Sequence, residues 1–476
     1  MDDSRPDRLA RLPTGLARVL VLVVCDGAAV LASGVVAYLL WAMMVRDQPV
    51  TLYLELAPLW PLFTLSYALG GLYPGSGVSA IELIRTASRQ TSFVFLIILG
   101  SIYVFRMPAD YSRLTLALWW GMALVAVPLG RAGLSAVAAP WSWWWEPVIL
   151  MGDRARLEAL IDTLAHARHI GYRPVAVVLI ADDGGGPPAL WHGVPAVAES
   201  DLAAEAVRCG VRTVLVSSDV PGLERRAAGL SESVRHVMSV HAIENHFVEP
   251  VAIRYLGSSI GIEIQNRMLM RRNQILKRTV DVVVATVCLA ISLPVMLLAA
   301  MLVVSAERGT WWYAQVREGR GGRHFRMWKL RTMYSDADAR LDRHLTTSPS
   351  ARDQWAREFK LDDDPRVLPG IGAVLRRWSL DECPQFWNVI RGDMSLVGPR
   401  ALPRYHLDVF EAPFRTLRQR VRPGMTGMWQ VMSRGEGAIR TQEVLDSYYI
   451  YNWSIWMDAF ILARTVLAVI GGRGAR

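Results

Sequence analysis

The first third of the chain alternates long apolar stretches with short polar connections, the apolar stretches falling at 15–44, 56–73, 91–107 and 113–142. Each is near the roughly 20 residues that a helix needs to cross a bilayer, and the first is much longer than the apolar part of a removable signal peptide. The pattern predicts a bundle of four transmembrane helices at 15–142, preceded by a cytoplasmic tail at 1–14.

Basic residues are unevenly distributed around these stretches. One side of the predicted bundle carries Arg5, Arg8, Arg11, Arg18, Arg85 and Arg89, and the other carries Arg46, Arg106 and Arg113. Because positively charged connections stay in the cytoplasm, this bias predicts that both ends of the bundle are cytoplasmic. Asp26 lies within the first stretch, either as a functional group or as a side chain that reaches the interface.

A fifth apolar segment, 282–304, is also long enough to cross a membrane. Its flanks are basic on both sides, which favours a cytoplasmic location for both of its ends. Pro294 in the middle removes a backbone donor and clashes with the preceding turn. We therefore predict a re-entrant helix broken at Pro294, with an ordinary kinked span as the alternative.

Between the two apolar regions, short β-rich runs alternate with helical ones. This alternation predicts a Rossmann-like α/β domain with a parallel sheet at 143–248, followed by a linker at 249–276. The turn after the first predicted strand, 152–156, lacks the G-x-G-x-x-G pattern that lets a pyrophosphate approach a helix. A scaffold or regulatory role is favoured over a nucleotide site, and mediating a homodimer is a candidate task.

Composition agrees with a membrane protein, since 52% of the residues are hydrophobic and 20% are charged. The net charge of +9 arises mostly after residue 300, where 27 basic residues face 19 acidic ones. Such a region suits an anionic membrane face, a nucleic acid or a phosphate-rich substrate. The four cysteines are scattered and form no C-x-x-C pair, so a bound metal would be held by oxygen.

The basic carboxy-terminal region contains a glycine- and arginine-rich loop followed by a predicted strand at 325–333. The strand displays Lys329 and Arg331 on one face, suited either to a polyanion or to lipid head groups. Asp364-Pro365-Arg366 and Arg376 follow. Two turn-rich segments, 392–400 with Arg400 and 422–430, are suited to present backbone donors and guanidinium groups to phosphate oxygens.

The acidic pair Asp381-Glu382 lies among these basic segments. Ser379-x-x-Glu382 is a capping-box pattern, although Pro384 favours a helix that begins slightly later. Adjacent helical residues point about 100° apart, so the two acids would take separate tasks. One is suited to attack phosphorus and the other to hold a hard cation such as Mg²⁺.

Together these strings resemble the bacterial sugar transferases of the monotopic phosphoglycosyl transferase superfamily. The resemblance covers 277–476, and the whole layout is similar to the long form typified by undecaprenyl-phosphate galactose phosphotransferases. It implies a re-entrant helix joined to a mixed α/β catalytic domain, on the cytoplasmic face of the bacterial inner membrane. The implied reaction moves a hexose 1-phosphate, galactose before glucose, from a UDP-sugar to undecaprenyl phosphate, with no nucleic acid as partner.

The resemblance also implies roles for individual residues. Asp381 would be the nucleophile that forms a phospho-sugar intermediate, and Glu382 would bind Mg²⁺. Pro294 matches the helix-breaking proline, and the charged positions around the donor are Lys329, Arg331, Asp364, Arg366, Arg376, Arg400 and Arg434.

Three positions depart from the family pattern. The usual Ser-Pro at the break is Leu293-Pro294, with the nearest serine displaced to Ser292; Met432-Ser433 precedes Arg434 in place of Ser-Gly; and Ala401 replaces a frequent proline.

Two other classes of function fit the sequence less well. A membrane-anchored nucleotide-sugar dehydratase or epimerase needs a glycine-rich loop and a Tyr-x-x-x-Lys pair, and the sequence has neither. A non-enzymatic scaffold for polysaccharide assembly would not require Asp381, Glu382 or the ordered phosphate-binding motifs.

Overall fold

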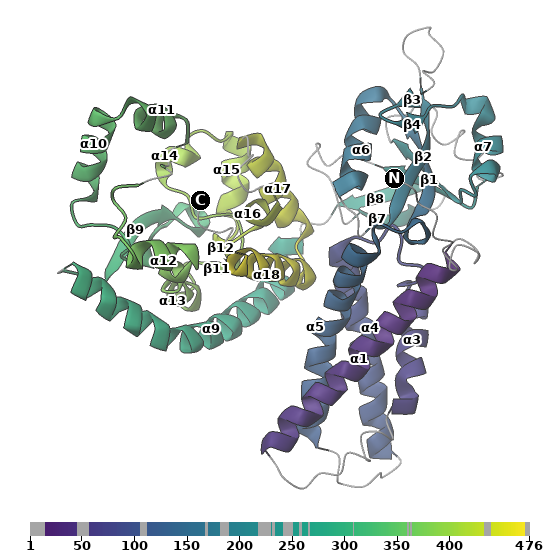
Figure 1. Cartoon of the computed structure of the whole chain (residues 1–476), viewed down its shortest axis with the longest axis horizontal. Coiled ribbons are helices and arrows are strands. Elements are labelled where there is room, and N and C mark those ends of the chain that lie inside the picture. The colour runs from purple at the N-terminus through teal and green to yellow at the C-terminus, as the bar shows by residue number, and fades with distance from the viewer. Residues whose placement is uncertain are drawn as a thin grey trace, which may run out of the picture. The chain divides into compact units, whose positions relative to one another are not determined.

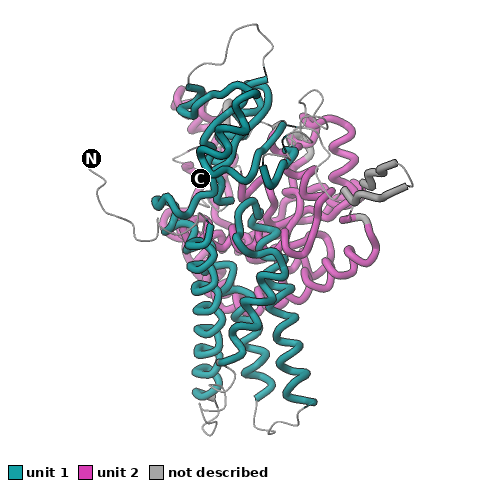
Figure 2. The backbone as a smooth tube through the Cα atoms, turned by 90° about the vertical axis from the view of Figure 1, so that its right-hand side faces the viewer, with its two compact units in different colours: residues 1–242 teal, residues 243–476 magenta. Residues whose placement is uncertain are grey.

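The computed structural model contains two compact units, residues 1–242 and 243–476 (Figure 2). It describes residues 15–44, 57–104, 112–166, 170–180, 190–217, 230, 234–240, 251–256, 259–264, 267–307, 309–358, 361, 364–432 and 439–471. The tail predicted at 1–14 therefore lies outside the described residues.

The first unit begins with the predicted four-helix bundle, formed by α1 (Leu16–Met44), α3 (Trp60–Leu69), α4 (Ala80–Val104) and α5 (Arg113–Ala138) (Figure 1). Its core is built around Phe63, Tyr67, Phe95 and Trp119, whose rings meet edge to face. Helices α1, α4 and α5 are long and apolar enough to span a membrane. This confirms a membrane protein with a four-helix bundle.

The second and third helices differ from the predicted spans. Helix α3 has only ten residues, preceded by the 3-10 turn Ala57–Leu59, because Gly70-Gly71 ends it. Helix α4 begins at Ala80, so Arg85 and Arg89 lie inside a helix and not in a connection as predicted. Because the first turns of α4 are polar, the length of its apolar stretch does not mark where the helix begins.

Asp26 is paired with Arg131 of α5 and does not reach the interface. The Arg131 guanidinium donates two hydrogen bonds to the Asp26 carboxylate, Nε to Oδ1 at 2.8 Å and Nη2 to Oδ2 at 2.6 Å. The Tyr73 hydroxyl donates to the same carboxylate at 2.7 Å, and Arg131 Nη1 donates to the carbonyl of Leu72 at 3.0 Å. Asp26 thus joins α1, α5 and the connection after α3.

The α/β domain confirms the Rossmann-like prediction. Strands β1 (Glu146–Gly152), β2 (Tyr172–Leu179), β5 (Thr213–Ser217) and β6 (His236–Val240) form a parallel sheet in the order β2-β1-β5-β6. The domain also contains helices α6 (Arg154–His166) and α7 (Leu202–Arg208) and a small hairpin of β3 (Leu190–Trp191) and β4 (Val194–Pro195). The strand order reverses between β1 and β5, where ligands bind in such sheets. Here the Asp153 carboxylate accepts the backbone N–H of Arg156 at the start of α6. This places a negative charge where a pyrophosphate would need donors.

The second unit begins with an antiparallel hairpin, β7 (Val251–Leu256) and β8 (Ser259–Ile264), in the range predicted as linker. Helix α9 (Arg271–Ala306) follows and is also long and apolar enough to span a membrane. Every residue of α9 is helical, Pro294 included. The predicted break of the helix at Pro294 is therefore wrong. Figure 1 shows α9 as a curved helix along one side of this unit. Its re-entry to the same membrane face stays a prediction.

The rest of the unit is a mixed α/β domain packed on α9. Strands β9 (Trp312–Glu318) and β10 (His324–Leu330) pair antiparallel, and β11 (Ser395–Val397) pairs parallel with β12 (Gly424–Thr426). The helices are α10 (Ala337–Thr347), α11 (Pro349–Glu358), α12 (Ile371–Arg377), α13 (Gln385–Arg391), α14 (Arg404–Leu407), α15 (Ala412–Gln419), α16 (Met428–Met432), α17 (Ile439–Asn452) and α18 (Ile455–Ile470).

Three buried charges fasten α9 to this domain. Lys277 Nζ lies 2.8 Å from Oδ2 of Asp458 on α18 and 3.6 Å from Oδ1 of Asp281, one turn along α9. Asp281 accepts the hydroxyl of Ser395 on β11 at 2.7 Å, and Asp458 accepts the hydroxyl of Tyr449 on α17 at 2.7 Å. The partners offset the large cost of removing these charges from water.

The pair Asp26–Arg131 generates a stability prediction. Asp26→Asn leaves the buried Arg131 charge uncompensated, which is expected to cost about 3–5 kcal/mol. The apparent Tm of the detergent-solubilised protein should fall well below that of the parent. The double variant Asp26→Leu/Arg131→Leu, which removes both charges, should have a Tm closer to that of the parent. A Tm equal to or lower than that of Asp26→Asn would contradict this account.

Candidate active site

Asp381 and Glu382 lie in a short 3-10 turn, Leu380–Glu382, ahead of α13. Ser379 has a φ of 53°, in the left-handed region that few residues other than glycine adopt, and its side chain makes no capping hydrogen bond. The capping-box interpretation is therefore wrong. The regular helix begins at Gln385, after Pro384, as the position of the proline predicted. The left-handed residue turns the chain sharply just before the two acids.

Lys329 of β10 reaches both carboxylates. Its Nζ lies 2.7 Å from Oε1 of Glu382 and 3.8 Å from Oδ2 of Asp381. The Asp381 residue is 9% exposed, whereas the Glu382 side chain is 31% exposed. One ammonium group therefore lies close to a buried carboxylate and to a more exposed one. The predicted strand, confirmed as β10, brings this lysine to the acids across 53 positions of sequence.

The two acids have different electrostatic surroundings. Burial raises the pKa of Asp381 to about 6, against the opposing charge of Lys329, while Glu382 adds to the increase. Burial opposes ionisation of Glu382 as well, but Lys329 and Arg400 outweigh it and lower the pKa of that carboxyl. Both groups are mainly ionised at neutral pH, and Asp381 is the one that titrates nearest to it.

Asp364, Arg366 and Arg376 form a second charged group near the turn. Arg366 donates to both Asp364 oxygens, at 2.8 and 2.7 Å, and lies over the ring of Trp355. Burial lowers the pKa of Arg376, while the charges of Asp381 and Asp364 act to raise it. Arg376 also donates to the Thr332 hydroxyl at 3.0 Å. The Asp364–Arg366 fork is preorganised, and the positive charge of Arg376 acts on both Asp364 and Asp381.

The remaining predicted site residues differ in their placement. Arg400 is exposed, and its charge acts on Glu382. Arg331 is buried and turned to the end of α9, where its Nη2 donates to the carbonyl of Glu307 at 2.8 Å. The structure thus gives Arg331 a structural contact, whereas Lys329, two positions earlier, meets the acids. Arg434 lies outside the described residues.

Further residues lie near this site. Gln385 is buried and acts to lower the pKa of Glu382, and Ser292 of α9 acts to lower the pKa of the Cys383 thiol, which burial raises. The displaced serine of α9 therefore lies near the residue that follows the acidic pair. Arg418 donates to the Arg400 carbonyl and, at 2.8 Å, to the Asp446 carboxylate. No short motif marks Arg418, because its two partners are distant in sequence.

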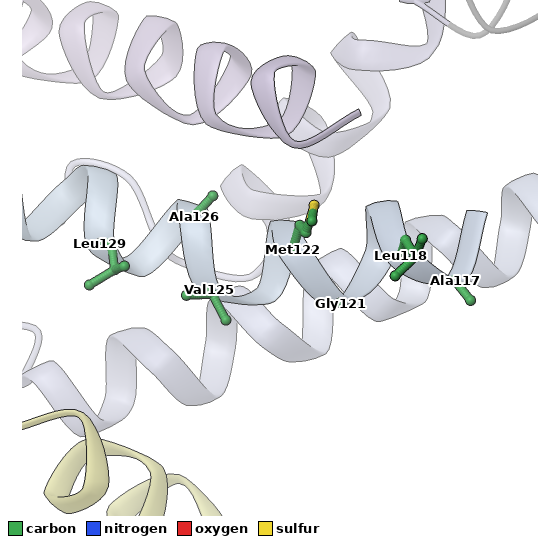
Figure 3. Close-up of a pocket in the computed structure, with 7 residues that line it drawn as sticks. All are labelled: Ala117, Leu118, Gly121, Met122, Val125, Ala126 and Leu129. Atoms are coloured by element: carbon green, nitrogen blue, oxygen red, sulfur yellow. The ribbon is translucent and has the colours of Figure 1, made fainter. Parts of the chain in front are cut away.

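The hollow drawn in Figure 3 lies elsewhere, along α5 of the bundle. Its lining is apolar and consists of Ala117, Leu118, Gly121, Met122, Val125, Ala126 and Leu129. It offers no charged group to a phosphorylated substrate, and a surface of this kind suits lipid chains.

The donor atoms fit a magnesium ion that is shared with substrate phosphates. Among the described residues, no three His, Cys, Asp or Glu side chains cluster as a metal site. Mg²⁺ is commonly held by only one or two carboxylates together with phosphate oxygens and water. The partly exposed Glu382, with Lys329 on one of its oxygens, provides such a carboxylate.

Comparison with known proteins identifies the family of this chain. Residues 272–472 match the family model described as bacterial sugar transferase. The chain is 30% identical over 372 residues to a UDP-galactose-lipid carrier transferase of Erwinia amylovora, and 29% identical over 374 residues to an undecaprenyl-phosphate galactose phosphotransferase of Salmonella typhimurium. Both alignments cover 77% of each chain.

A UDP-glucose:undecaprenyl-phosphate glucose-1-phosphate transferase of Caulobacter vibrioides is 39% identical over 203 residues, which are 41% of this chain and 69% of that protein. The two longer alignments exceed the family match and so include residues that precede α9. The similarity therefore covers part of the first unit as well as the acidic turn and its basic surroundings. The chain belongs to the bacterial sugar transferase family.

Proposed function

We propose that this membrane protein transfers a hexose 1-phosphate from a UDP-sugar to undecaprenyl phosphate, the first membrane step of O-antigen, capsule or exopolysaccharide synthesis. The observation that carries the proposal is the contact of one ammonium group, Lys329, with the buried Asp381 and the more open Glu382. In a member of the bacterial sugar transferase family, this arrangement suits phosphoryl transfer through a carboxylate nucleophile.

In the first step, an Asp381 carboxylate oxygen attacks the phosphorus that carries the sugar. A bond forms between that oxygen and phosphorus, the bond from phosphorus to the bridging oxygen breaks, and UMP leaves with the electron pair. Lys329 holds the carboxylate in place and keeps it ionised despite burial. Arg376 and Arg400 supply positive charge for the donor diphosphate.

In the second step, an oxygen of undecaprenyl phosphate attacks the same phosphorus. The bond to Asp381 breaks, which restores the carboxylate and gives undecaprenyl-diphosphate-sugar. The two steps form a ping-pong cycle that needs no separate general base, because both nucleophiles are anions when they react. Mg²⁺, held by Glu382 and the donor, would neutralise charge on the diphosphate.

The acceptor places the reaction at the membrane. We propose that α9 enters and leaves the bilayer on the cytoplasmic face of the bacterial inner membrane, because its basic flanks favour the same side. Galactose is the preferred donor sugar in the proposal, as two relatives that align with 77% of this chain are named for galactose. Glucose is the alternative, since a relative named for glucose aligns with part of the chain. The homodimer stays a prediction.

UMP release tests the proposal directly. The detergent-solubilised protein with Mg²⁺ and undecaprenyl phosphate should release UMP from UDP-galactose faster than from UDP-glucose. Asp381→Asn should lower the rate on the order of 10³-fold or more, because the amide is not a nucleophile. Asp342→Asn, which alters an exposed carboxylate on α10, is the control and should retain the parent rate.

Three results would count against parts of the proposal. Full activity of Asp381→Asn would remove Asp381 from the role of nucleophile. A preference for UDP-glucose would replace galactose with glucose. Absence of UMP from both donors would favour another sugar or a scaffold without enzymatic activity.

The electrostatics of the site generate a pH prediction. Asp381 must be ionised to attack, and its pKa is about 6, so kcat/KM for the donor should fall as the pH drops through about 6. Lys329→Met removes the charge that lowers this pKa, so the acid limb should move up by about 1 pH unit or more. In a ping-pong cycle, kcat/KM for the donor reports the first step alone and excludes titration of the acceptor phosphate.

Arg326→Met is the matched control, because Arg326 lies on the same strand with its side chain exposed. Its acid limb should stay near pH 6. An unshifted limb in Lys329→Met would show that Lys329 does not govern the ionisation of the nucleophile.

A further inference from the structure

Asn388 is fully buried on α13, the helix that directly follows the acidic turn. Its side-chain amide makes three hydrogen bonds. Oδ1 accepts the backbone N–H of Trp328 at 3.0 Å, and Nδ2 donates to the carbonyl of Arg326 at 2.8 Å and to Oδ2 of Asp393 at 3.2 Å. Two of the three partners belong to the backbone of β10, about 60 positions earlier in the chain.

The two backbone partners of Asn388 lie on an edge of β10 that pairs with no described strand. Strand β10 pairs with β9 on one side, and among the described strands it has no second neighbour. Arg326 and Trp328 are two residues apart, so their free N–H and C=O groups lie along the same edge. The amide of Asn388 presents one acceptor and one donor to that edge, as the peptide of a neighbouring strand would. It thereby fixes where α13 lies along β10.

The position of α13 along β10 determines how close the acids lie to Lys329. Trp328 is adjacent to Lys329, whose ammonium group contacts Asp381 and Glu382. The acids in turn precede α13 by only two residues. The other end of α13 is held by Arg278 of α9, which donates to the carbonyls of Val389 and Ile390 at 2.6 and 2.7 Å. With that end fixed, Asn388 provides a direct hydrogen-bonded link between the helix after the acids and the strand that carries the lysine.

We infer that Asn388 is a positioning residue for the proposed reaction: its side-chain amide pairs with the free edge of β10 and so holds Lys329 against Asp381 and Glu382. The inference rests on the proposed function for its catalytic consequence, while the pairing itself is a property of the fold. Loss of the amide removes two contacts to the strand. The strand and its lysine are then able to move away from the acids without loss of any group that touches substrate.

The test compares the full-length Asn388→Ala protein with the parent in two measurements. Hydrogen–deuterium exchange of the peptide that contains Trp328 should be faster in the variant, and this needs no enzymatic activity. The donor kcat/KM, followed by UMP release, should fall on the order of 10²-fold, as expected for a displaced catalytic group. Its acid limb should move to higher pH, in the direction expected for Lys329→Met.

Two further variants make the test specific. Asn452→Ala is the matched control, because Asn452 is a buried asparagine of the same unit that hydrogen-bonds only within α17. It should leave exchange at β10 and the acid limb unchanged. In a Lys329→Met background, Asn388→Ala should shift the acid limb no further, because the lysine whose position it controls is gone.

The outcomes separate the two proposals. If the parent releases no UMP but exchange at β10 rises in Asn388→Ala, the proposed function fails while the pairing stands. If Asn388→Ala is folded and leaves both exchange and acid limb unchanged, the positioning role is overturned. If Asn388→Ala does not fold, Asn388→Leu, which has a similar volume and no amide, takes its place and should show the same changes. Failure of both variants to fold would make Asn388 a folding residue and overturn the inference.

Discussion

The second unit depends on the two environments of α9, which exposes apolar side chains suited to a membrane and also packs against a domain that carries many charges. Most of the helix is apolar and exposed, yet its amino-terminal half buries Lys277 and Asp281. These charges are tolerated because Asp458, Ser395 and Tyr449 complete their hydrogen bonds from three other elements. One contiguous network thus attaches α17, α18 and β11 to α9.

Helix α13 extends this attachment to the acids. Arg278 of α9 binds carbonyls at the end of the helix, and Arg422 donates to the carbonyl of Gly392 at 2.9 Å, directly after it. Basic side chains at these carbonyls satisfy acceptors that the helix itself leaves free. The helix that follows the acidic turn is therefore attached to α9 at its carboxy-terminal end. Under the proposed function, this attachment links the acidic turn that attacks phosphorus to the apolar helix that meets the membrane.

In the first unit, Arg18 plays the corresponding part between the bundle and the α/β domain. Predicted as a flank of the first span, it is instead buried in α1. Its guanidinium donates to the carbonyls of Gly75, Trp144 and Gly171 and lies over the ring of Trp144. A single cation therefore ties α1, the connection after α3 and the start of β2 together. The α/β domain is fixed at the end of the bundle where α1 begins.

The sequence by itself determined the features that depend on local pattern. Apolar length gave the bundle and α9, alternation gave the parallel sheet and β10, and ordered motifs gave the family, because each is written in residues that are neighbours in the chain. Glycines and a polar first turn shortened α3 and lengthened α4, which apolar length alone does not register.

Only the tertiary structure decided which charges meet. Lys329 contacts the acids while Arg331 contacts Glu307, although the two basic residues are two positions apart in one predicted pattern. Asn388 lies six positions after Glu382, yet its partners are on a strand about 60 positions away. Local pattern specifies an element and its faces, but the partner of a buried polar group is set by which elements pack together, and that is a property of the whole fold.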